Sequence, residues 1–511
     1  MRNLLSLTIL LTAFAGLTAT AQTQAVKRRI NLVERSLVGP VRSKDTLGWT
    51  IWQRMAHYNV KGVSIAVINN YKLEWAKGYG LADAAAKSPV TTQTLFQAGS
   101  ISKSINAIGI LKLVQTGSVD LNTDINKYLI SWKFPYDSLS QGHSITLANL
   151  LSHTAGLNVP GFVGYSENDA IPSILQVIRG VKPANSAAIH SIFAPGKRHE
   201  YSGGGTTISQ LIVEDVTHQT YDRYMQNEVL KRLNMVNSTF AVPNKKGTHV
   251  VATGYYDNGK QIEGKFHLYP EKAAAGLWTT PTDLAKYIIA IQEAYKGKPG
   301  TYLNSHFAKI MLTPYIDQRA ALGVFIDNFD GEEYFEHDGL TYGFYSQYFG
   351  SLTNGNGVVV MTNSVNTMLI PEIINSVAKV YGFKGLYRSK TEKNIALDDV
   401  TLQSYCGNYT LAPGAVLTIF TENKQLYVRL TGQEKIALFP ETASKFIMKV
   451  VDAQLEFVKD KSGNVTKVIL YQNGSANEAP KTNKTIKNCN RTNIINLNRC
   501  YHCFHTTNTV K

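Results

Sequence analysis

The sequence has no cysteine over most of its length. The four cysteines, Cys406, Cys489, Cys500 and Cys503, all lie in the last quarter of the 511 residues. The main part of the chain, from residue 22 to residue 400, therefore contains neither a thiol nucleophile nor a disulfide. A chain of this length buries a core large enough to fold without covalent or metal staples.

Charged residues are also few, at 17% of the chain, and the net charge is +15. Six cations lie in the last 31 residues, which hold no Asp or Glu, so the remainder is only mildly basic. No Lys/Arg cluster alternates with aromatic residues, as a nucleic-acid-binding platform requires. This balance excludes a nucleic-acid partner and suits a surface that faces anionic envelope polymers.

Long apolar runs are missing except at the N-terminus. Arg2 precedes an apolar run from Leu4 to Leu17, and Ala19-Thr20-Ala21 forms a small-residue cleavage site before Gln22. The run is too short to span a bilayer, so it favours a signal peptide over residues 1–21 rather than a membrane anchor. We expect an exported protein, periplasmic or secreted, without stable membrane insertion after cleavage.

The C-terminal residues 479–511 are basic, rich in Asn and Thr, and weakly patterned. Cys500-Tyr-His-Cys503 with His505 has the spacing of one zinc knuckle. Structural zinc sites usually pair two knuckles, so the pattern favours a disordered tail, with metal binding there left open. No cofactor or metal is expected for the main part of the chain.

Two segments of different kind lie between the ends. Residues 46–385 alternate helix-like and strand-like runs. After a linker at 386–400, residues 401–478 hold short alternating strands with turns, which predict a small antiparallel barrel or sandwich. The expected elements of the first segment are a hairpin over 63–75, helices over 101–115, 206–216, 282–295 and 370–381, and strands over 342–349 and 357–362.

Ser100-Ile-Ser-Lys103 is the first candidate for chemistry. Residues three apart share a helix face, so the lysine amine can lie beside the serine hydroxyl. A serine hydroxyl needs such a base, and a desolvated lysine is neutral enough to serve. The spacing alone is weak, because Ser376 and Lys379 repeat it.

Tyr201 and His337-Asp-Gly339 are the second and third candidates. Tyr201 precedes a glycine-rich turn, Ser202 to Gly205, and could relay a proton if nearby cations lowered its pKa. His337 could line the edge of a cleft, and Gly339 allows a substrate to approach the backbone. Taken alone, the Tyr201 pattern is more often that of a half-buried core tyrosine, and the His337 pattern more often that of a surface histidine.

Together and in this order, the three motifs resemble those of the serine β-lactamase-like superfamily, in its branch of class C β-lactamases, D-alanyl-D-alanine carboxypeptidases and esterases. The resemblance covers about residues 46–385. It implies an α/β (α+β) fold, with an antiparallel sheet flanked by helices and an all-helical subdomain, before the small C-terminal all-β domain. Framework segments that resemble the family are 95–100, 117–129, 145–157, 233–239 and 273–284.

The resemblance also implies roles for individual residues. Ser100 would be the acylated nucleophile, Lys103 its proton acceptor and Tyr201 the relay to the leaving group. The backbone N–H groups of Ser100 and Leu340, the residue after Gly339, would form the oxyanion hole.

The sequence departs from the family pattern at two positions. Gly203 stands where the family's lactamases carry an asparagine, whose amide contacts the substrate and the lysine. His337 stands where many members carry lysine, and would give a weaker, pH-dependent charge for a substrate carboxylate. Both departures favour a D-alanyl peptidase or esterase acting on small peptides or esters. The alternatives are a class C-like β-lactamase and a catalytically silent protein that binds penicillin or cell-wall peptides.

Overall fold

The computed structural model describes residues 24–39, 41–42, 48–243, 250–388, 390–391, 395–412, 414–448, 453–472 and 475–482. The chain forms two compact units, one of Met1–Leu37 with Gly48–Tyr387 and one of Val38–Leu47 with Arg388–Lys511. The predicted signal peptide and the cysteines at 489, 500 and 503 lie outside the described residues. Within those residues, every helix is too short or too polar to span a membrane.

An antiparallel sheet of seven strands forms the centre of the first unit, in the order β4-β3-β2-β10-β9-β8-β7. Its middle strands, β2 and β10, are rich in β-branched residues and buried along nearly their whole length, as strands covered on both faces are. The strands are β2 (Gly62–Asn69), β3 (Lys72–Asp83), β4 (Ser88–Pro89), β7 (Phe325–Phe329), β8 (Glu332–Thr341), β9 (Phe344–Ser351) and β10 (Gly357–Thr362).

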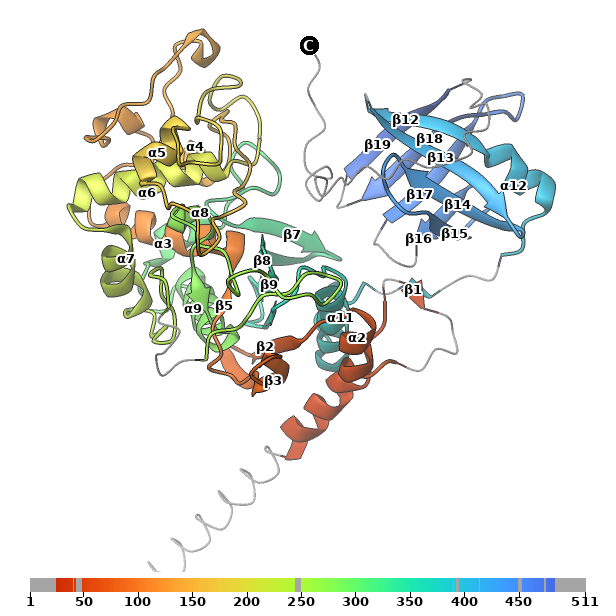
Figure 1. Ribbon diagram of the computed structural model, residues 1–511, viewed down its shortest axis with the longest axis horizontal. Coiled ribbons are helices and arrows are strands. Elements are labelled where there is room, and N and C mark those ends of the chain that lie inside the picture. Colours follow the sequence, from red (N-terminus) through yellow and green to blue (C-terminus); the bar gives the residue numbers. More distant parts are fainter. Residues whose placement is uncertain are drawn as a thin grey trace, which may run out of the picture. The chain divides into compact units, whose positions relative to one another are not determined.

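Helices cover both faces of this sheet (Figure 1). On one face, α2 (Ile51–His57) and α11 (Leu369–Tyr381) enclose one apolar core. On the other, α3 (Ser102–Gln115) and α9 (Pro281–Tyr295) enclose a second, larger core, and the short pair β5 (Phe96–Gln97) and β6 (Trp278–Thr279) lies beside α3. A further helix spans residues 24–34. The predicted α/β fold with an antiparallel sheet between helices is confirmed.

The helix α3 is more deeply buried than a single apolar stripe predicts. Ile101, Ile105 and Ile108 are fully buried, and so are the polar residues Ser104 beside them and Asn106 on another face. The polar groups among them are satisfied internally, since Ser104 Oγ donates to the Gly323 carbonyl and Asn106 Nδ2 to Ser209 Oγ. The helix therefore runs through the interior of the unit and holds its first turn in a fixed position.

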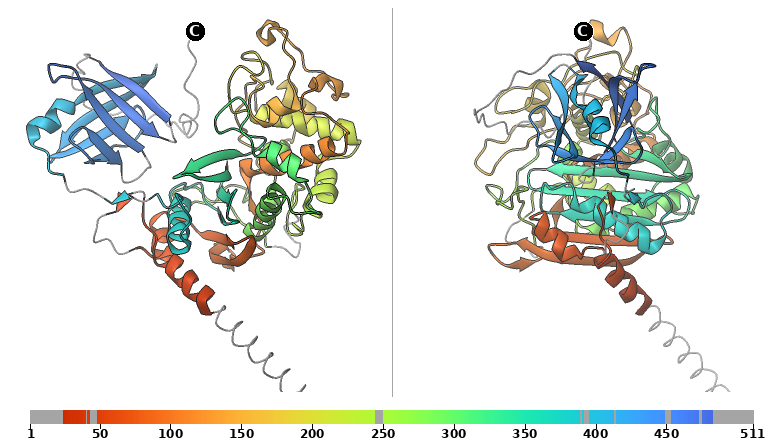
Figure 2. Two further views of the ribbon diagram at one scale, coloured as in Figure 1. Left: turned by 180° about the vertical axis from the view of Figure 1, so that it is seen from behind. Right: turned by 90° about the vertical axis from the view of Figure 1, so that its right-hand side faces the viewer.

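The remaining helices of the first unit gather mostly beside the sheet, with α4 to α7 forming a helical subdomain (Figures 1 and 2). Most begin at a side-chain cap, such as Ser173 of α5 and Asn304 of α10. They are α4 (Leu147–Leu151), α5 (Ile174–Arg179), α6 (Gly203–Thr217), α7 (Tyr221–Tyr224), α8 (Lys272–Ala275) and α10 (Ser305–Met311), with a π-helical turn η4 (Met225–Leu230) and 3₁₀ turns η1 (Gly99–Ile101), η2 (Ile125–Lys127) and η3 (Ser138–Ser140).

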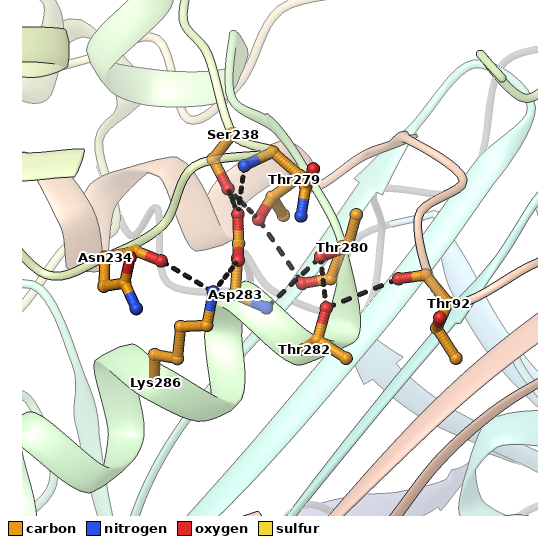
Figure 3. A network of polar contacts seen from close by, with 9 residues as sticks. Thr92, Asn234, Ser238, Thr279, Thr280, Thr282, Asp283 and Lys286 are labelled. Atoms are coloured by element: carbon orange, nitrogen blue, oxygen red, sulfur yellow. Dashed lines mark hydrogen bonds and ion pairs between the residues drawn. The ribbon is translucent and has the colours of Figure 1, made fainter. Parts of the chain in front are cut away.

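A buried carboxylate anchors the start of α9 (Figure 3). Asp283 is fully buried and accepts hydrogen bonds from Asn237 N (2.8 Å), Ser238 Oγ (2.9 Å) and Lys286 Nζ (2.8 Å). Its own N–H donates to the cap residue Thr280. This network joins two segments that the sequence marks only as framework, 233–239 and 273–284.

The second unit contains a closed antiparallel barrel, β12 to β19, preceded by α12 (Asp399–Tyr405). Its interior is filled by side chains such as Tyr405, Tyr409, Phe446 and Phe457. The last strand runs to Thr482, past the expected domain end at 478, because residues 479–482 continue the ladder with β12 and β18. The strands are β12 (Gly407–Ala412), β13 (Ala415–Glu422), β14 (Gln425–Leu430), β15 (Ile436–Pro440), β16 (Lys445–Met448), β17 (Ala453–Lys459), β18 (Val465–Gln472) and β19 (Ser475–Thr482); β1 (Val41–Arg42) and β11 (Lys390–Thr391) form a separate parallel pair.

Candidate active site

Ser100 lies in the 3₁₀ turn η1, directly before α3, and Lys103 lies in the first turn of that helix. Lys103 Nζ is 3.0 Å from Ser100 Oγ. The turn is held by Ser102, whose hydroxyl donates to the Gly99 carbonyl (2.6 Å) and accepts from Leu277 N (3.0 Å). The structure thus brings together the serine and the lysine that their spacing predicted to meet.

Lys103 is almost completely buried, at 3% exposure, and Nζ also donates to the Ala274 carbonyl at 2.9 Å. Burial lowers the pKa of Lys103 to about 7, against the opposing effect of the Asp338 carboxylate. An amine with this pKa is about half neutral at pH 7. The bond to Ala274 uses one of its hydrogens, so its lone pair can accept the proton of Ser100.

Tyr201 completes the arrangement from the loop before α6. Lys103 Nζ lies 5.0 Å from the centre of the tyrosine ring, and the hydroxyl hydrogen-bonds with Ser100. The expectation that nearby cations lower its pKa is wrong. Burial raises the pKa of Tyr201 well above its usual value, and the Asp338 and Glu336 carboxylates add to this. Tyr201 is therefore a neutral hydroxyl, which can pass a proton on but cannot stand as a phenolate.

His337 lies on β8, and only 1% of it is exposed. The Nδ1 atom of the ring lies 2.6 Å from the backbone carbonyl oxygen of Asp338. Because a carbonyl oxygen only accepts, Nδ1 carries the ring proton. Burial, with a further contribution from Lys103, lowers the pKa of His337 to about 3. The expectation of a pH-dependent charge for a substrate carboxylate is therefore wrong, because the imidazole is neutral throughout the physiological range.

Gly339 and Gly99 let β8 approach the nucleophile turn closely. A Cβ atom on Gly339 would lie 1.9 Å from the Ala98 carbonyl oxygen and 2.9 Å from Ser100 N. A Cβ atom on Gly99, whose φ is +53°, would lie 2.9 Å from Leu340 N. Both N–H groups expected to bind an oxyanion therefore belong to the junction between η1 and β8, where only glycine fits.

Gly203 is the first residue of α6, after the cap residue Ser202. Its N–H donates to the Pro160 carbonyl at 3.1 Å. A Cβ atom at this position would lie 3.1 Å from both that oxygen and the Phe162 ring. The space into which a side chain at residue 203 would extend is thus bounded by Phe162.

Three further aromatic residues surround Tyr201, and the sequence motifs did not identify them. The His153 ring centre lies 4.3 Å from that of Tyr201, and its Nδ1 accepts from Ser202 N at 3.2 Å. Phe325 packs against Tyr201, His153 and His199. Burial lowers the pKa of both histidines, so this wall of the site is neutral. The sequence pointed to His153 only through its place in segment 145–157, which resembles the framework of the family.

Metal ligands are not grouped in the described part of the chain, where no three His, Cys, Asp or Glu side chains could together hold an ion. Cys406 is a free, half-buried thiol in the second unit. The site presents the serine hydroxyl, the amine, the phenol and the backbone N–H groups.

Comparison with known proteins covers both units. Residues 50–374 match the family model Beta-lactamase, and residues 391–485 match a domain of unknown function, DUF3471. Protein flp of Staphylococcus aureus (strain N315) is 27% identical over 335 residues, 62% of this chain and 62% of that protein. The chain thus spans less than two thirds of that relative. A penicillin-binding protein of Bacillus subtilis (strain 168) is 22% identical over 79% of this chain and 91% of its own length.

Solved structures share the fold. The octameric penicillin-binding protein homologue from Pyrococcus abyssi superposes with a TM-score of 0.58 at 24% identity, covering 84% of this chain and 98% of that one. The penicillin-binding protein from Bacillus halodurans gives a TM-score of 0.52 at 21% identity, covering 65% and 98%. Because the family model matches more than half of the residues, including all those placed around Ser100, the chain belongs to the β-lactamase family.

Proposed function

We propose that this protein is a serine hydrolase that forms an acyl-enzyme at Ser100 and acts on small peptide or ester substrates. The observation that carries the proposal is the pairing of Ser100 with a buried lysine. Lys103 Nζ lies 3.0 Å from Ser100 Oγ, and burial lowers the pKa of Lys103 to about 7. General bases work best when their pKa lies near the working pH.

In the proposed acylation step, Lys103 Nζ takes the proton of Ser100 Oγ as that oxygen bonds to the substrate carbonyl carbon. The negative charge that develops on the carbonyl oxygen is received by the N–H groups of Ser100 and Leu340. Such a pair contributes several kcal/mol in the transition state, about 3–4 for each donor. Tyr201 then gives its proton to the leaving group as the bond between that group and carbon breaks, and it receives from Lys103 Nζ the proton that the amine took from Ser100, so the amine is neutral again.

In the proposed deacylation step, a water molecule replaces the departed group. As the water oxygen bonds to the acyl carbon, its proton passes to Lys103 through the Tyr201 hydroxyl, because Tyr201 hydrogen-bonds with Ser100 and lies beside the amine. The C–O bond to Ser100 breaks and the serine recovers its proton. Tyr201 gives one proton and receives one, so it remains neutral, in agreement with its raised pKa.

Esters and neutral peptides fit this site better than β-lactams. Residue 203 offers no amide to a β-lactam side chain, and its neighbourhood holds the Phe162 ring instead. His337, with its pKa lowered to about 3, offers no positive charge to a substrate carboxylate. These two observations favour the peptidase or esterase reading over the class C-like β-lactamase.

We also propose that the protein is exported, on the strength of the N-terminal sequence from Arg2 to Gln22. Expression with residues 1–21 present should yield a periplasmic or secreted product that begins at Gln22, as N-terminal sequencing would show. A cytoplasmic product that retains Met1 would contradict this.

The test of catalysis is intact-protein mass spectrometry after exposure to a fluorophosphonate and, separately, to penicillin. A single adduct on Ser100 that is absent from Ser100→Ala, while Ser376→Ala still forms it, supports the proposal. Ser376 is the matched control because it repeats the lysine spacing in α11. An unlabelled protein would favour the silent binding protein, and rapid loss of a penicillin adduct would favour a β-lactamase.

A further inference from the structure

Four apolar side chains lie beside the proposed oxyanion hole, on two segments that are far apart in sequence. Leu340 and Tyr342 are each 37% exposed, Val163 is 51% exposed and Phe162 is half-buried. Large apolar groups at this exposure are unusual when they cluster, and a cluster next to a catalytic centre is typical of a binding surface.

A ring stack and two hydrogen bonds join these residues into one surface. The Tyr342 ring stacks on His267, with ring centres 4.4 Å apart and planes 12° apart. His267 Nδ1 in turn lies 2.9 Å from the Val163 carbonyl oxygen. The Tyr342 N–H also donates to Tyr269 at 3.3 Å. The loop that carries Val163 is thereby fastened to the end of β8.

The direction of β8 decides which part of a substrate would lie on this surface. The strand passes Tyr201 at His337, with ring centres 6.4 Å apart, and then reaches Leu340, whose N–H belongs to the oxyanion hole. Tyr342 follows two residues later, in the turn directly after the end of β8. Because Tyr201 serves the leaving group, the acyl group extends the opposite way, toward Tyr342.

We propose that Phe162, Val163, Leu340 and Tyr342 form an acyl-side subsite that selects an apolar acyl group, aliphatic or aromatic, of about four to eight carbons. This inference rests on the proposed function and narrows it, since a small acyl group such as acetyl would leave the four side chains uncovered. Phe162 occupies the place next to Gly203 where a polar side chain would otherwise face the acyl group.

The first experiment varies the acyl chain with the leaving group held constant. Across p-nitrophenyl acetate, butyrate, hexanoate and octanoate, kcat/KM should rise by up to about fourfold per methylene until the surface is covered. Ethyl, butyl and hexyl acetate, which lengthen only the alcohol, should give a nearly flat series. A flat acyl series, or a steeper alcohol series, would overturn the subsite.

The double variant Val163→Ser with Tyr342→Ser should lower the hexanoate-to-acetate ratio at least tenfold. The hydrogen bonds of both residues named above use backbone atoms and remain in the double variant, which loses the side chains and the stack of Tyr342 on His267. Ile130→Ser is the matched control. Ile130 is 66% exposed and bonds through its N–H to Asp215, which lies twelve residues along α6 from Gly203, or about 18 Å. A ratio that survives in the double variant would refute the assignment.

A binding measurement separates this inference from the proposed function. In Ser100→Ala, calorimetry with the N-methyl amides of acetic, hexanoic and octanoic acid should show affinity increasing with chain length, and the increase should vanish when Val163 and Tyr342 are also replaced by serine. Chain-dependent binding without any turnover by the wild type would overturn the hydrolase and keep the subsite. Turnover by the wild type together with binding that does not depend on chain length would overturn the subsite and keep the hydrolase.

Discussion

Lys103 Nζ lies 2.9 Å from the carbonyl oxygen of Ala274 and 3.0 Å from the hydroxyl oxygen of Ser100. The amine is thus held between an oxygen that only accepts and a hydroxyl that can give up its proton. In a buried setting this geometry suits the neutral amine, whose lone pair is directed to the serine when one N–H is used by Ala274.

We expect kcat/KM for an activated ester to fall about tenfold per pH unit below pH 7. Lys103 must be neutral to take the Ser100 proton, and its pKa is about 7. The nearby imidazoles should not contribute, because burial lowers the pKa of both His153 and His337. A pH–rate profile measures this. A slope near two in the plot of log kcat/KM against pH, or loss of the fall below pH 7 in His337→Gln, would show that a histidine titrates instead.

We expect Lys103→Met to stabilise the fold most strongly at low pH. Burial lowers the pKa of Lys103 from 10.5 to about 7, so between these values the unfolded chain binds a proton that the folded chain does not. The stability of the wild type therefore rises with pH across this window, by about 1.4 kcal/mol per unit. The variant lacks this rise, and its advantage should shrink from pH 7 to 10.5.

Urea unfolding at several pH values measures that difference, with Lys309→Met as the control. Lys309 is exposed on α10. An advantage of Lys103→Met that stays constant between pH 7 and pH 10 would mean that the buried lysine is charged in the folded protein.

We expect Tyr201→Phe to lower kcat by about 10²- to 10⁴-fold and to leave the pH midpoint unchanged. The hydroxyl carries protons but does not itself ionise, because burial raises its pKa well above the usual value. Tyr295→Phe, on α9, is a control that should keep full activity. A shifted midpoint in Tyr201→Phe would assign the titrating group to the tyrosine, and full activity would remove it from the mechanism.

We expect p-nitrophenyl butyrate to be turned over with a higher kcat/KM than a chromogenic cephalosporin. A missing amide contact at residue 203 costs about 1–3 kcal/mol, or about 5- to 150-fold if it is made in the transition state. Gly203→Asn alone should not recover lactamase activity, because its Cβ would meet Phe162 at 3.1 Å. Gly203→Asn with Phe162→Ala should improve the cephalosporin rate. A wild-type cephalosporin rate near the diffusional limit would contradict this prediction.

We expect Asp283→Ala to lower the free energy of unfolding by about 2–5 kcal/mol, because three donors lose their acceptor inside the fold. Denaturant unfolding measures the loss, and Glu263→Ala, at an exposed carboxylate, should change stability by less than about 0.5 kcal/mol. An equal effect of both substitutions would show that the network in Figure 3 adds nothing to stability.

Local patterns predicted the elements that carry Ser100 and Lys103, because a helix brings residues three apart together whatever else surrounds it. The late strands and the closing helix were also predicted from local sequence patterns. The strand β10 is confirmed over Gly357–Thr362, and α11 begins one residue before the predicted start. The barrel was visible in its short strands, but its last strand, Ser475–Thr482, was missed because it has few large apolar residues and pairs with β12 and β18 through the backbone.

What the sequence could not supply was the environment of each side chain. Tyr201 and His337 are neutral because they are buried. Their burial depends on residues such as Phe325, which packs against both rings and lies far from Tyr201 in the sequence. Phe162 and the start of α6 at Gly203 likewise lie side by side, although forty residues separate them in the sequence. No local periodicity of the sequence predicts such a contact. The catalytic roles of these residues stay predictions until the variants above are measured.

The junction of Gly99 and Gly339 has a consequence for how this protein can change over evolution. The proposed oxyanion hole there consists of main-chain N–H groups, so mutations that alter the side chains around it can change substrate choice without altering those groups. The same junction has almost no tolerance of its own, since one added methyl group at Gly339 would come within 1.9 Å of Ala98 O. Descendants of this chain are therefore free to diversify in the loop around Val163, while any substitution of Gly339 by a residue with a side chain should end hydrolysis at once.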